Sequence, residues 1–182
     1  KNWYDSHKEL HKQELRMPSI PQFVEFINYL KNGYSNKQEA DSILDEILTV
    51  RSPWRSEWLD AKFEKKGRQM YIDYNHTVQG NDVVSQSQEK LENYLTKDKL
   101  PGIDLQDWLT NPTKQGLPDK NCKDGSLYYW APRDGKVARF YALSGWANLD
   151  CNWNPVGRID SLGVRGVASP SGTQKNSGGN LK

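Results

Sequence analysis

The sequence predicts an α+β domain in which a helical N-terminal half is followed by a C-terminal antiparallel sheet. Helical spacing of apolar residues dominates the first hundred or so residues, whereas alternation and turn dipeptides dominate from Gly116 onward. The 182 residues fit one domain, and no linker divides them. We therefore expect a single domain over residues 1–167, followed by a flexible tail over 168–182 that is rich in Ser, Gly and Asn.

Capping residues and apolar stripes predict two helices near the N-terminus. The first begins after Ser19, which has capping-box spacing with Gln22, and ends near Gly33. The second begins with the same spacing at Ser35, and its apolar residues over 40–48 form a stripe on one helical face.

Weaker signals predict the segments that follow. Pro53 indicates a third helix with Trp58 inward, because proline at the first helical position loses no hydrogen bond. Residues 68–74 alternate as in a strand, and the polar stretch 75–82 is expected to be a loop. A helix over about 85–95 and a short helix capped by Asp104 complete this half.

Turn dipeptides divide the C-terminal part into strands. Asp134-Gly135 separates 127–130 from 137–142, which is a strong hairpin signal, and Ser144-Gly145 separates 137–142 from 146–152. Successive strand residues point to opposite faces of a sheet. The residues expected to face inward are Ala138, Phe140, Ala142, Ala147, Leu149 and Cys151. Those expected to face outward to solvent are Arg139, Tyr141, Leu143, Trp146, Asn148, Asp150 and Asn152.

The outward set favours a binding surface over an ordinary solvated sheet face. A solvated face needs only polar residues, whereas this one mixes aromatic side chains with Asn, Asp, Ser and Gly. That mixture is typical of antibody-like binding surfaces.

Composition argues against two classes of partner. The net charge is +2 and no long run of like charges is present, so we expect no binding of nucleic acid. No apolar run reaches the roughly 20 residues that span a bilayer, so we expect no membrane span. Lys1-Asn2-Trp3-Tyr4 does not open a signal peptide.

Few residues are placed for catalysis or metal binding. His7 and His11, four apart on a predicted helix, are half of a metal site, but we expect them to be solvated because His76 is the only other histidine. Glu57 and Asp60 are expected on a salt-bridged helix surface.

The two cysteines, Cys122 and Cys151, can pair or remain thiols, and pairing Cys122 with His76 is the only arrangement for a thiol nucleophile. No phosphate loop, nucleophile elbow or calcium loop is present. We therefore expect no enzyme activity, no metal and no cofactor.

Several C-terminal motifs resemble a known family. The run Gly125–Arg133, the spaced apolar residues of 137–151, Asn154-Pro155 and the closing 162–165 resemble variable proteins of diversity-generating retroelements, above all their archaeal and archaeal-virus branch. The helical half matches only loosely. The resemblance implies a C-type lectin fold of the formylglycine-generating-enzyme type.

It also implies a variable region over about 125–166, in which replacement of adenines in asparagine-type codons diversifies surface positions. Trp146 and Trp153 fall outside the residues that such codons reach, so the resemblance implies that they belong to the scaffold and still touch ligand. The expected ligand-binding residues are Arg139, Tyr141, Leu143, Ser144, Gly145, Trp146, Asn148, Asp150, Asn152, Trp153, Asn154, Arg158 and Asp160.

Two departures limit what the resemblance carries. The tripeptide of calcium-dependent sugar-binding lectins is absent, so neither calcium nor carbohydrate is inferred. Cys122 and Cys151 also lack the local motif that surrounds the copper-binding cysteine pair of the formylglycine-generating enzyme. The leading hypothesis is a protein that binds a macromolecular ligand, a protein or a cell-surface receptor, on a virion or cell surface. The rival hypotheses are a small thiol-dependent enzyme and a structural virion subunit.

Overall fold

The computed structural model describes residues 1–49, 55–143, 146–158 and 161–168. The helices are α1 (Trp3–Lys12), α2 (Ile20–Asn32), α3 (Lys37–Leu48) and α4 (Leu105–Thr110). The strands are β1 (Leu15–Arg16), β2 (Ser56–Lys66), β3 (Gln69–Gln79), β4 (Asp82–Lys90), β5 (Lys99–Ile103), β6 (Leu127–Trp130), β7 (Val137–Leu143), β8 (Trp146–Trp153), β9 (Leu162–Gly163) and β10 (Val167–Ala168).

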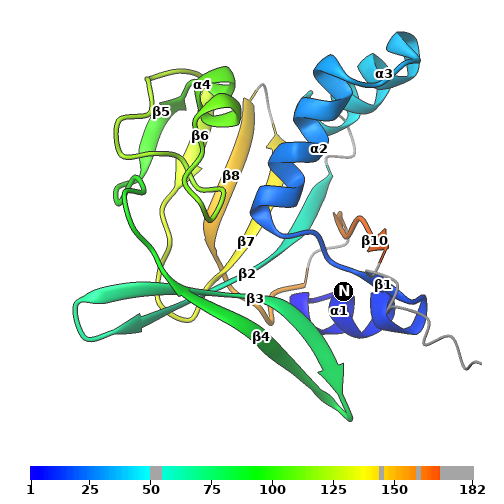
Figure 1. The fold of residues 1–182 in the computed structure, drawn as a ribbon, viewed down its shortest axis with the longest axis vertical. Coiled ribbons are helices and arrows are strands. Elements are labelled where there is room, and N and C mark those ends of the chain that lie inside the picture. Colours follow the sequence, from blue (N-terminus) through cyan, green and yellow to red (C-terminus); the bar gives the residue numbers. More distant parts are fainter. Residues whose placement is uncertain (50–54, 144–145, 159–160, 169–182) are drawn as a thin grey trace, which may run out of the picture.

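Most strands belong to one sheet, with the order β4-β3-β2-β7-β8-β6-β5 and with β9 beside β2. Its pairs are antiparallel except β6–β8 and β2–β9, which are parallel. β1 and β10 form a separate two-stranded sheet. In Figure 1 the long β3–β4 hairpin crosses the lower part of the molecule, with α2 and α3 at upper right and α1 at lower right. The predicted α+β class is confirmed.

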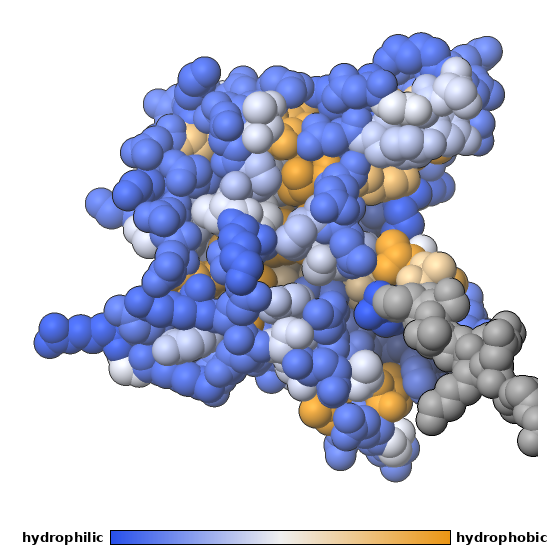
Figure 2. Space-filling view, in the orientation of Figure 1, coloured by the Kyte–Doolittle hydropathy of each residue, from blue (hydrophilic) through white to orange (hydrophobic). Residues whose placement is uncertain are grey.

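Two hydrophobic cores lie on opposite faces of the sheet. The larger core packs α2, α3 and α4 against the inward row of β7 and β8, and its aromatic centre includes Phe23 and Phe140, whose ring centroids are 4.9 Å apart. The smaller core, under α1, contains Trp3, Trp58 and Val137. The sheet is therefore covered on both faces near β2. The molecular surface seen in Figure 2 is mostly hydrophilic, with apolar residues near the centre and the lower edge of the view.

The helices with clear caps form where the sequence predicts them. Ser19 and Gln22 make both bonds of the capping box of α2, which ends at Gly33. The α3 helix also forms, but Asn36 caps it in place of Ser35. Asp104 caps α4 and accepts from the backbone N–H of Asp107. Within the described ranges, no helix is both long and apolar enough to cross a membrane.

The helix expected to carry His7 and His11 forms as α1, but two other helical predictions were wrong. Residues 56–66 form β2, not a helix begun at Pro53, which itself lies outside the described residues together with Trp54. Residues 82–90 form β4, and 75–79 belong to β3 where a loop was expected. The β2 strand is buried on both faces, so it lacks the alternation of polarity that marks a strand. The β4 strand is polar, and its pairing with β3 decides its conformation.

The C-terminal sheet agrees with the prediction in part. β7 and β8 are antiparallel neighbours as expected, although Ser144 and Gly145 between them lie outside the described residues. The hairpin predicted at Asp134-Gly135 was wrong, because β6 pairs with β8 and β5 and not with β7. That turn bonds to β2 instead, where Gly135 N–H donates to Phe63 O at 2.9 Å. Ala168 pairs with Leu15 in place of starting a tail, and 169–182 lie outside the described residues.

Candidate functional site

The outward residues of β6, β7 and β8 share one sheet face, opposite the larger core. Register places Leu143 beside Trp146, Tyr141 beside Asn148 and Arg139 beside Asp150. The parallel pairing of β6 then sets Tyr128 beside Asn148 and Trp130 beside Asp150. We call these eight residues the aromatic face: Tyr128, Trp130, Arg139, Tyr141, Leu143, Trp146, Asn148 and Asp150.

A buried ion pair forms the floor of the aromatic face. Arg139 Nε and Nη2 both lie 3.1 Å from Asp150 Oδ2, and Asp150 Oδ1 accepts the backbone N–H of Asn152 at 2.9 Å. The guanidinium also lies over the rings of Tyr141, at 4.3 Å, and Trp153, at 3.5 Å. Burial lowers the pKa of Arg139, and the charge of Asp150 opposes that shift.

This geometry corrects the expectation that the whole row faces solvent. Arg139, Asn148 and Asp150 are buried, with exposed fractions of 4%, 2% and 6%. Alternation indicates which face of a sheet a residue is on, but not whether large neighbours cover that face. Here the rings of Tyr141 and Trp153 lie over the guanidinium and help to exclude water from it.

The opposite end of the aromatic face is open. Trp146 is 42% exposed and Leu143 is 36% exposed, and the two residues are cross-strand partners. The Trp146 ring stacks on Tyr128 of the neighbouring strand, with centroids 5.0 Å apart and planes 11° from parallel. Tyr141, in contrast, is half-buried, and burial raises its pKa. Trp146 is therefore the accessible aromatic group of this face, not Tyr141.

The other predicted ligand-binding residues do not join this open end. Trp153 packs against the smaller core, and Asn152 is half-buried beside it. Asn154 and Arg158 are exposed beyond the end of β8, where Arg158 Nη2 pairs with Asp5 of α1 at 2.9 Å. Ser144, Gly145 and Asp160 lie outside the described residues.

Two members of the aromatic face, Tyr128 and Trp130, were not predicted as site residues. The local signal was present, because Leu127 and Tyr129 are buried in alternation with them. Because the sequence pattern predicted an antiparallel hairpin of β6 with β7, it did not place Tyr128 and Trp130 beside β8. Only the parallel pairing with β8 places both side chains beside Trp146 and Asp150.

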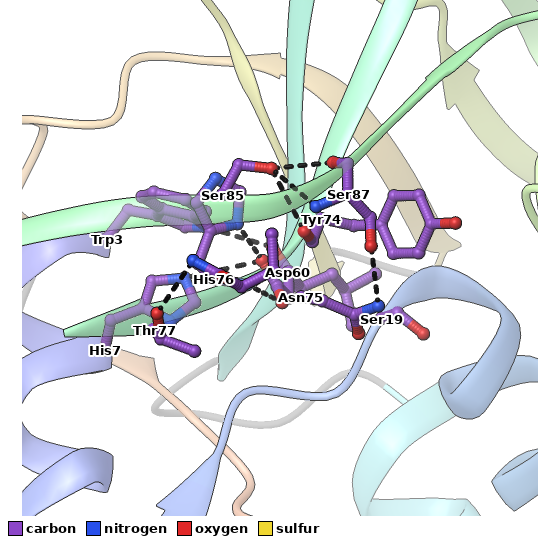
Figure 3. Close-up of polar contacts among 12 residues, drawn as sticks. Trp3, His7, Ser19, Asp60, Tyr74, Asn75, His76, Thr77, Ser85 and Ser87 are labelled. Carbon is purple, nitrogen blue, oxygen red and sulfur yellow. Dashed lines mark hydrogen bonds and ion pairs between the residues drawn. The ribbon is translucent and has the colours of Figure 1, made fainter. Parts of the chain in front are cut away.

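A second site gathers polar residues from three distant elements. His7 of α1, Asp60 of β2 and His76 of β3 point toward one another, and we call them the histidine cluster (Figure 3). His7 Nε2 lies 3.7 Å from Asp60 Oδ1, and His76 Nδ1 contacts the same oxygen. Asp60 Oδ2 accepts the backbone N–H of His76 at 3.0 Å.

Trp3 holds the helix of the histidine cluster against the sheet. Its ring is fully buried and edge-on to both imidazoles, with centroids 4.2 Å from His7 and 4.8 Å from His76. Its indole N–H donates to Leu59 O at 2.9 Å, one residue before Asp60. The first turn of α1 is capped by Asn2, which accepts from a backbone N–H at 2.8 Å. These contacts fix where His7 meets the β2 strand.

The sequence-based expectation of solvated His7 and Asp60 was wrong. Both are buried, with exposed fractions of 4% and 3%. Burial lowers the pKa of His7 to about 4, although the Asp60 carboxylate opposes the shift. A cavity of about 310 Å³ adjoins the cluster and is lined by His7, His76, His11 and Arg16 among others. Two imidazoles, a carboxylate and an open cavity are together suited to hold a metal ion.

The cysteines offer no nucleophile. Cys122 and Cys151 are both buried free thiols, so the disulfide alternative does not hold. Burial, followed by the charge of Asp107, raises the pKa of Cys122 to about 12, and burial also raises that of Cys151. His76 contacts Asp60 and not Cys122. A thiolate is the reactive form of cysteine, and these environments oppose its formation.

No family model, no curated protein and no solved structure matches this chain. Function is therefore inferred from the geometry of the aromatic face and of the histidine cluster.

Proposed function

We propose that this chain is a ligand-binding protein that recognises a macromolecular partner, a protein or a cell-surface receptor, through the aromatic face. The observation that carries the proposal is the exposed stack of Trp146 on Tyr128 beside Leu143. Tryptophan, tyrosine and arginine are the residues most enriched at the energetic centres of protein interfaces. An exposed tryptophan ring is stabilised when a partner covers it, because a large apolar area leaves water.

The floor of the face prepares it for binding. The Arg139–Asp150 pair joins adjacent strands and the Arg139 guanidinium lies over two rings, so the surface is held in one arrangement before a partner arrives. A preorganised surface loses less side-chain and backbone entropy on association than a loop does. The strands therefore supply rigidity, and the side chains at the open end supply specificity.

The resemblance to variable proteins of diversity-generating retroelements supports the same proposal. On this proposal the chain has a C-type lectin fold, and retroelement-driven substitution varies its surface within about 125–166. Variation is then confined by burial. Leu143 is exposed and tolerates many side chains, whereas a single change at Arg139 or Asp150 leaves a buried charge without its partner. We expect diversification at the open end and little at the floor.

The rival proposal of a thiol-dependent enzyme has no support in the described residues, because both thiols are buried and their pKa values are raised. No observation of the structure favours a purely structural virion subunit over a binding protein.

A display library tests the binding proposal. Tyr128, Leu143 and Trp146 are randomised on the intact chain, and folded variants are selected against a panel of purified proteins. The matched control library randomises Gln79, Gln86 and Gln88, exposed residues of the β3–β4 hairpin. We expect specific binders mainly from the first library. Replacing the selected residue at position 146 by alanine should weaken the binding free energy by about 2 kcal/mol or more. Equal yields from both libraries would refute a privileged face.

The genomic neighbourhood tests diversification separately. We expect a reverse-transcriptase gene beside a near-copy of the coding stretch for 125–166 that differs only at adenines. A locus with neither feature would remove the retroelement from the proposal and leave the binding surface to be judged by the library.

A further inference from the structure

The histidine cluster contains a nitrogen atom without a partner. His7 Nε2 makes no hydrogen bond within the described part of the chain, although the side chain is only 4% exposed. It lies 3.7 Å from Asp60 Oδ1, which His76 already contacts. A buried polar atom left unsatisfied costs about 1 to 3 kcal/mol. A purely hydrogen-bonded role for the cluster therefore leaves His7 unexplained.

The donor atoms of the cluster are close enough to share one ion. His7, Asp60 and His76 each offer an atom within 4.8 Å of the others. Zinc binds nitrogen and oxygen at about 2.0 to 2.2 Å, so two tetrahedral ligands lie about 3.3 to 3.5 Å apart. The separation of 3.7 Å between His7 Nε2 and Asp60 Oδ1 is slightly longer. His76 Nδ1 and Asp60 Oδ1 lie closer than this spacing, so these two atoms move apart and His7 Nε2 moves nearer when the three surround one ion.

The surroundings supply access and orientation. All three histidines of the chain line the same cavity of about 310 Å³, which gives an ion and water a route to the cluster. The backbone N–H of His76 holds Asp60 Oδ2 at 3.0 Å, and outer hydrogen bonds of this kind orient metal ligands. Arg16 also lines the cavity, and its charge favours hydroxide or another anion at an open coordination position.

We propose that His7, Asp60 and His76 bind one divalent transition-metal ion of the zinc class, with water or hydroxide from the adjoining cavity as the fourth ligand. Two imidazoles and one carboxylate with one open position are a donor set that zinc accepts. The ion replaces the proton between His76 Nδ1 and Asp60 Oδ1, and that proton leaves to solvent. The site is separate from the aromatic face and does not depend on its function.

Zinc titration of the untagged, chelator-treated full chain tests this proposal. Calorimetry with zinc chloride should give one ion per chain for the unsubstituted protein. His7→Gln, Asp60→Asn and His76→Gln should each weaken binding by at least about 100-fold, which exceeds the loss typical of an outer ligand-orienting residue. No binding to the unsubstituted chain, or binding that persists in Asp60→Asn and His76→Gln, would overturn the proposal.

His11→Ala is the matched control. His7 and His11 lie one turn apart on α1, so they can chelate an ion at the helix surface without Asp60 or His76. The buried site predicts that His11→Ala leaves zinc affinity within a few-fold. Loss of binding in His11→Ala together with retention in Asp60→Asn assigns the ion to the helix surface and contradicts the proposal.

A spectroscopic measurement keeps the proposal testable if the buried variants fail to fold. X-ray absorption of the zinc-loaded unsubstituted chain should show two imidazole ligands and no sulfur. One imidazole alone, or a cysteine ligand, would exclude the proposed donor set.

Discussion

The aromatic face and the histidine cluster both place a buried aspartate between partners, but they leave different atoms unsatisfied. In the aromatic face Asp150 is saturated by Arg139 and by a backbone N–H, and the unpaired buried atoms are the donors Arg139 Nη1 and Trp130 Nε1. In the histidine cluster the unpaired atom is an imidazole nitrogen, His7 Nε2. The two donors are buried where no ligand reaches them, whereas the imidazole nitrogen belongs to a residue that lines a cavity and can bind a cation. The difference teaches which kind of partner each site suits.

The two sites also differ in how they meet solvent. The aromatic face opens through Leu143 and Trp146, which are exposed to a third or more of their surface. All three members of the histidine cluster are less than a tenth exposed and are reached through a cavity. A large partner therefore fits the first site, whereas the second is open only to an ion or a small molecule that enters the cavity of about 310 Å³.

The largest effect on stability is expected at the floor of the aromatic face. Arg139→Ala should lower the free energy of unfolding by about 3 to 5 kcal/mol, because it leaves the buried Asp150 carboxylate without its cation. Chemical denaturation measures the change, and Arg68→Ala, at an exposed turn position, should cost less than about 0.5 kcal/mol. A loss below about 1 kcal/mol for Arg139→Ala would show that the floor is not structural.

A slightly smaller loss is expected at the histidine cluster of the metal-free protein. Asp60→Ala removes the acceptor of the backbone and ring N–H groups of His76 and should cost about 2 kcal/mol or more, since each unpaired donor costs at least about 1 kcal/mol. Asp82→Ala, at an exposed position of β4, is the control and should be nearly neutral. Equal stability of the two variants would mean that water replaces the carboxylate.

Low pH should destabilise the protein through His7 of the histidine cluster. Burial holds the pKa of His7 at about 4, below its ordinary value of 6.5, so its contribution to stability is present above pH 6.5 and is lost as the pH falls toward 4. Between pH 6.5 and 4.5 this single group should remove about 2 kcal/mol from the metal-free protein. In the presence of chelator, the melting temperature should therefore fall more steeply with decreasing pH for the unsubstituted chain than for His7→Gln. The same pH dependence in both proteins would mean that the folded protein accepts a charged His7 imidazole, and would contradict the prediction.

The smallest effect is expected at the open end of the aromatic face. Trp146→Ala and Leu143→Ala should each cost about 1 kcal/mol or less, because both side chains are already partly exposed in the fold. Thermal denaturation measures this. A loss comparable to that of Arg139→Ala would mean that Trp146 is part of the scaffold and is not available to a ligand.

Local rules predicted the elements whose signals are local. Ser19 with Gln22, and Asp104 before α4, satisfy backbone N–H groups within their own first turn, so the sequence alone specifies those helix starts. The inward and outward rows of β7 and β8 follow from alternation in the same way. The β2 strand defeated these rules because Trp58 and Asp60 on one face and Leu59 on the other are all buried.

Sequence by itself determined the α+β class and placed Arg139, Asp150 and Trp146 on one side of a sheet, because capping and alternation act between near neighbours. Only the tertiary structure decided that Arg139 and Asp150 are buried, that Tyr128 joins them through a parallel strand, and that His7 meets Asp60 and His76. The histidine cluster, for example, depends on the bond from His76 to Asp60, 16 residues away, and on the bond from Trp3 to Leu59, 56 residues away. The packing of whole elements fixes such contacts, and no local pattern encodes them.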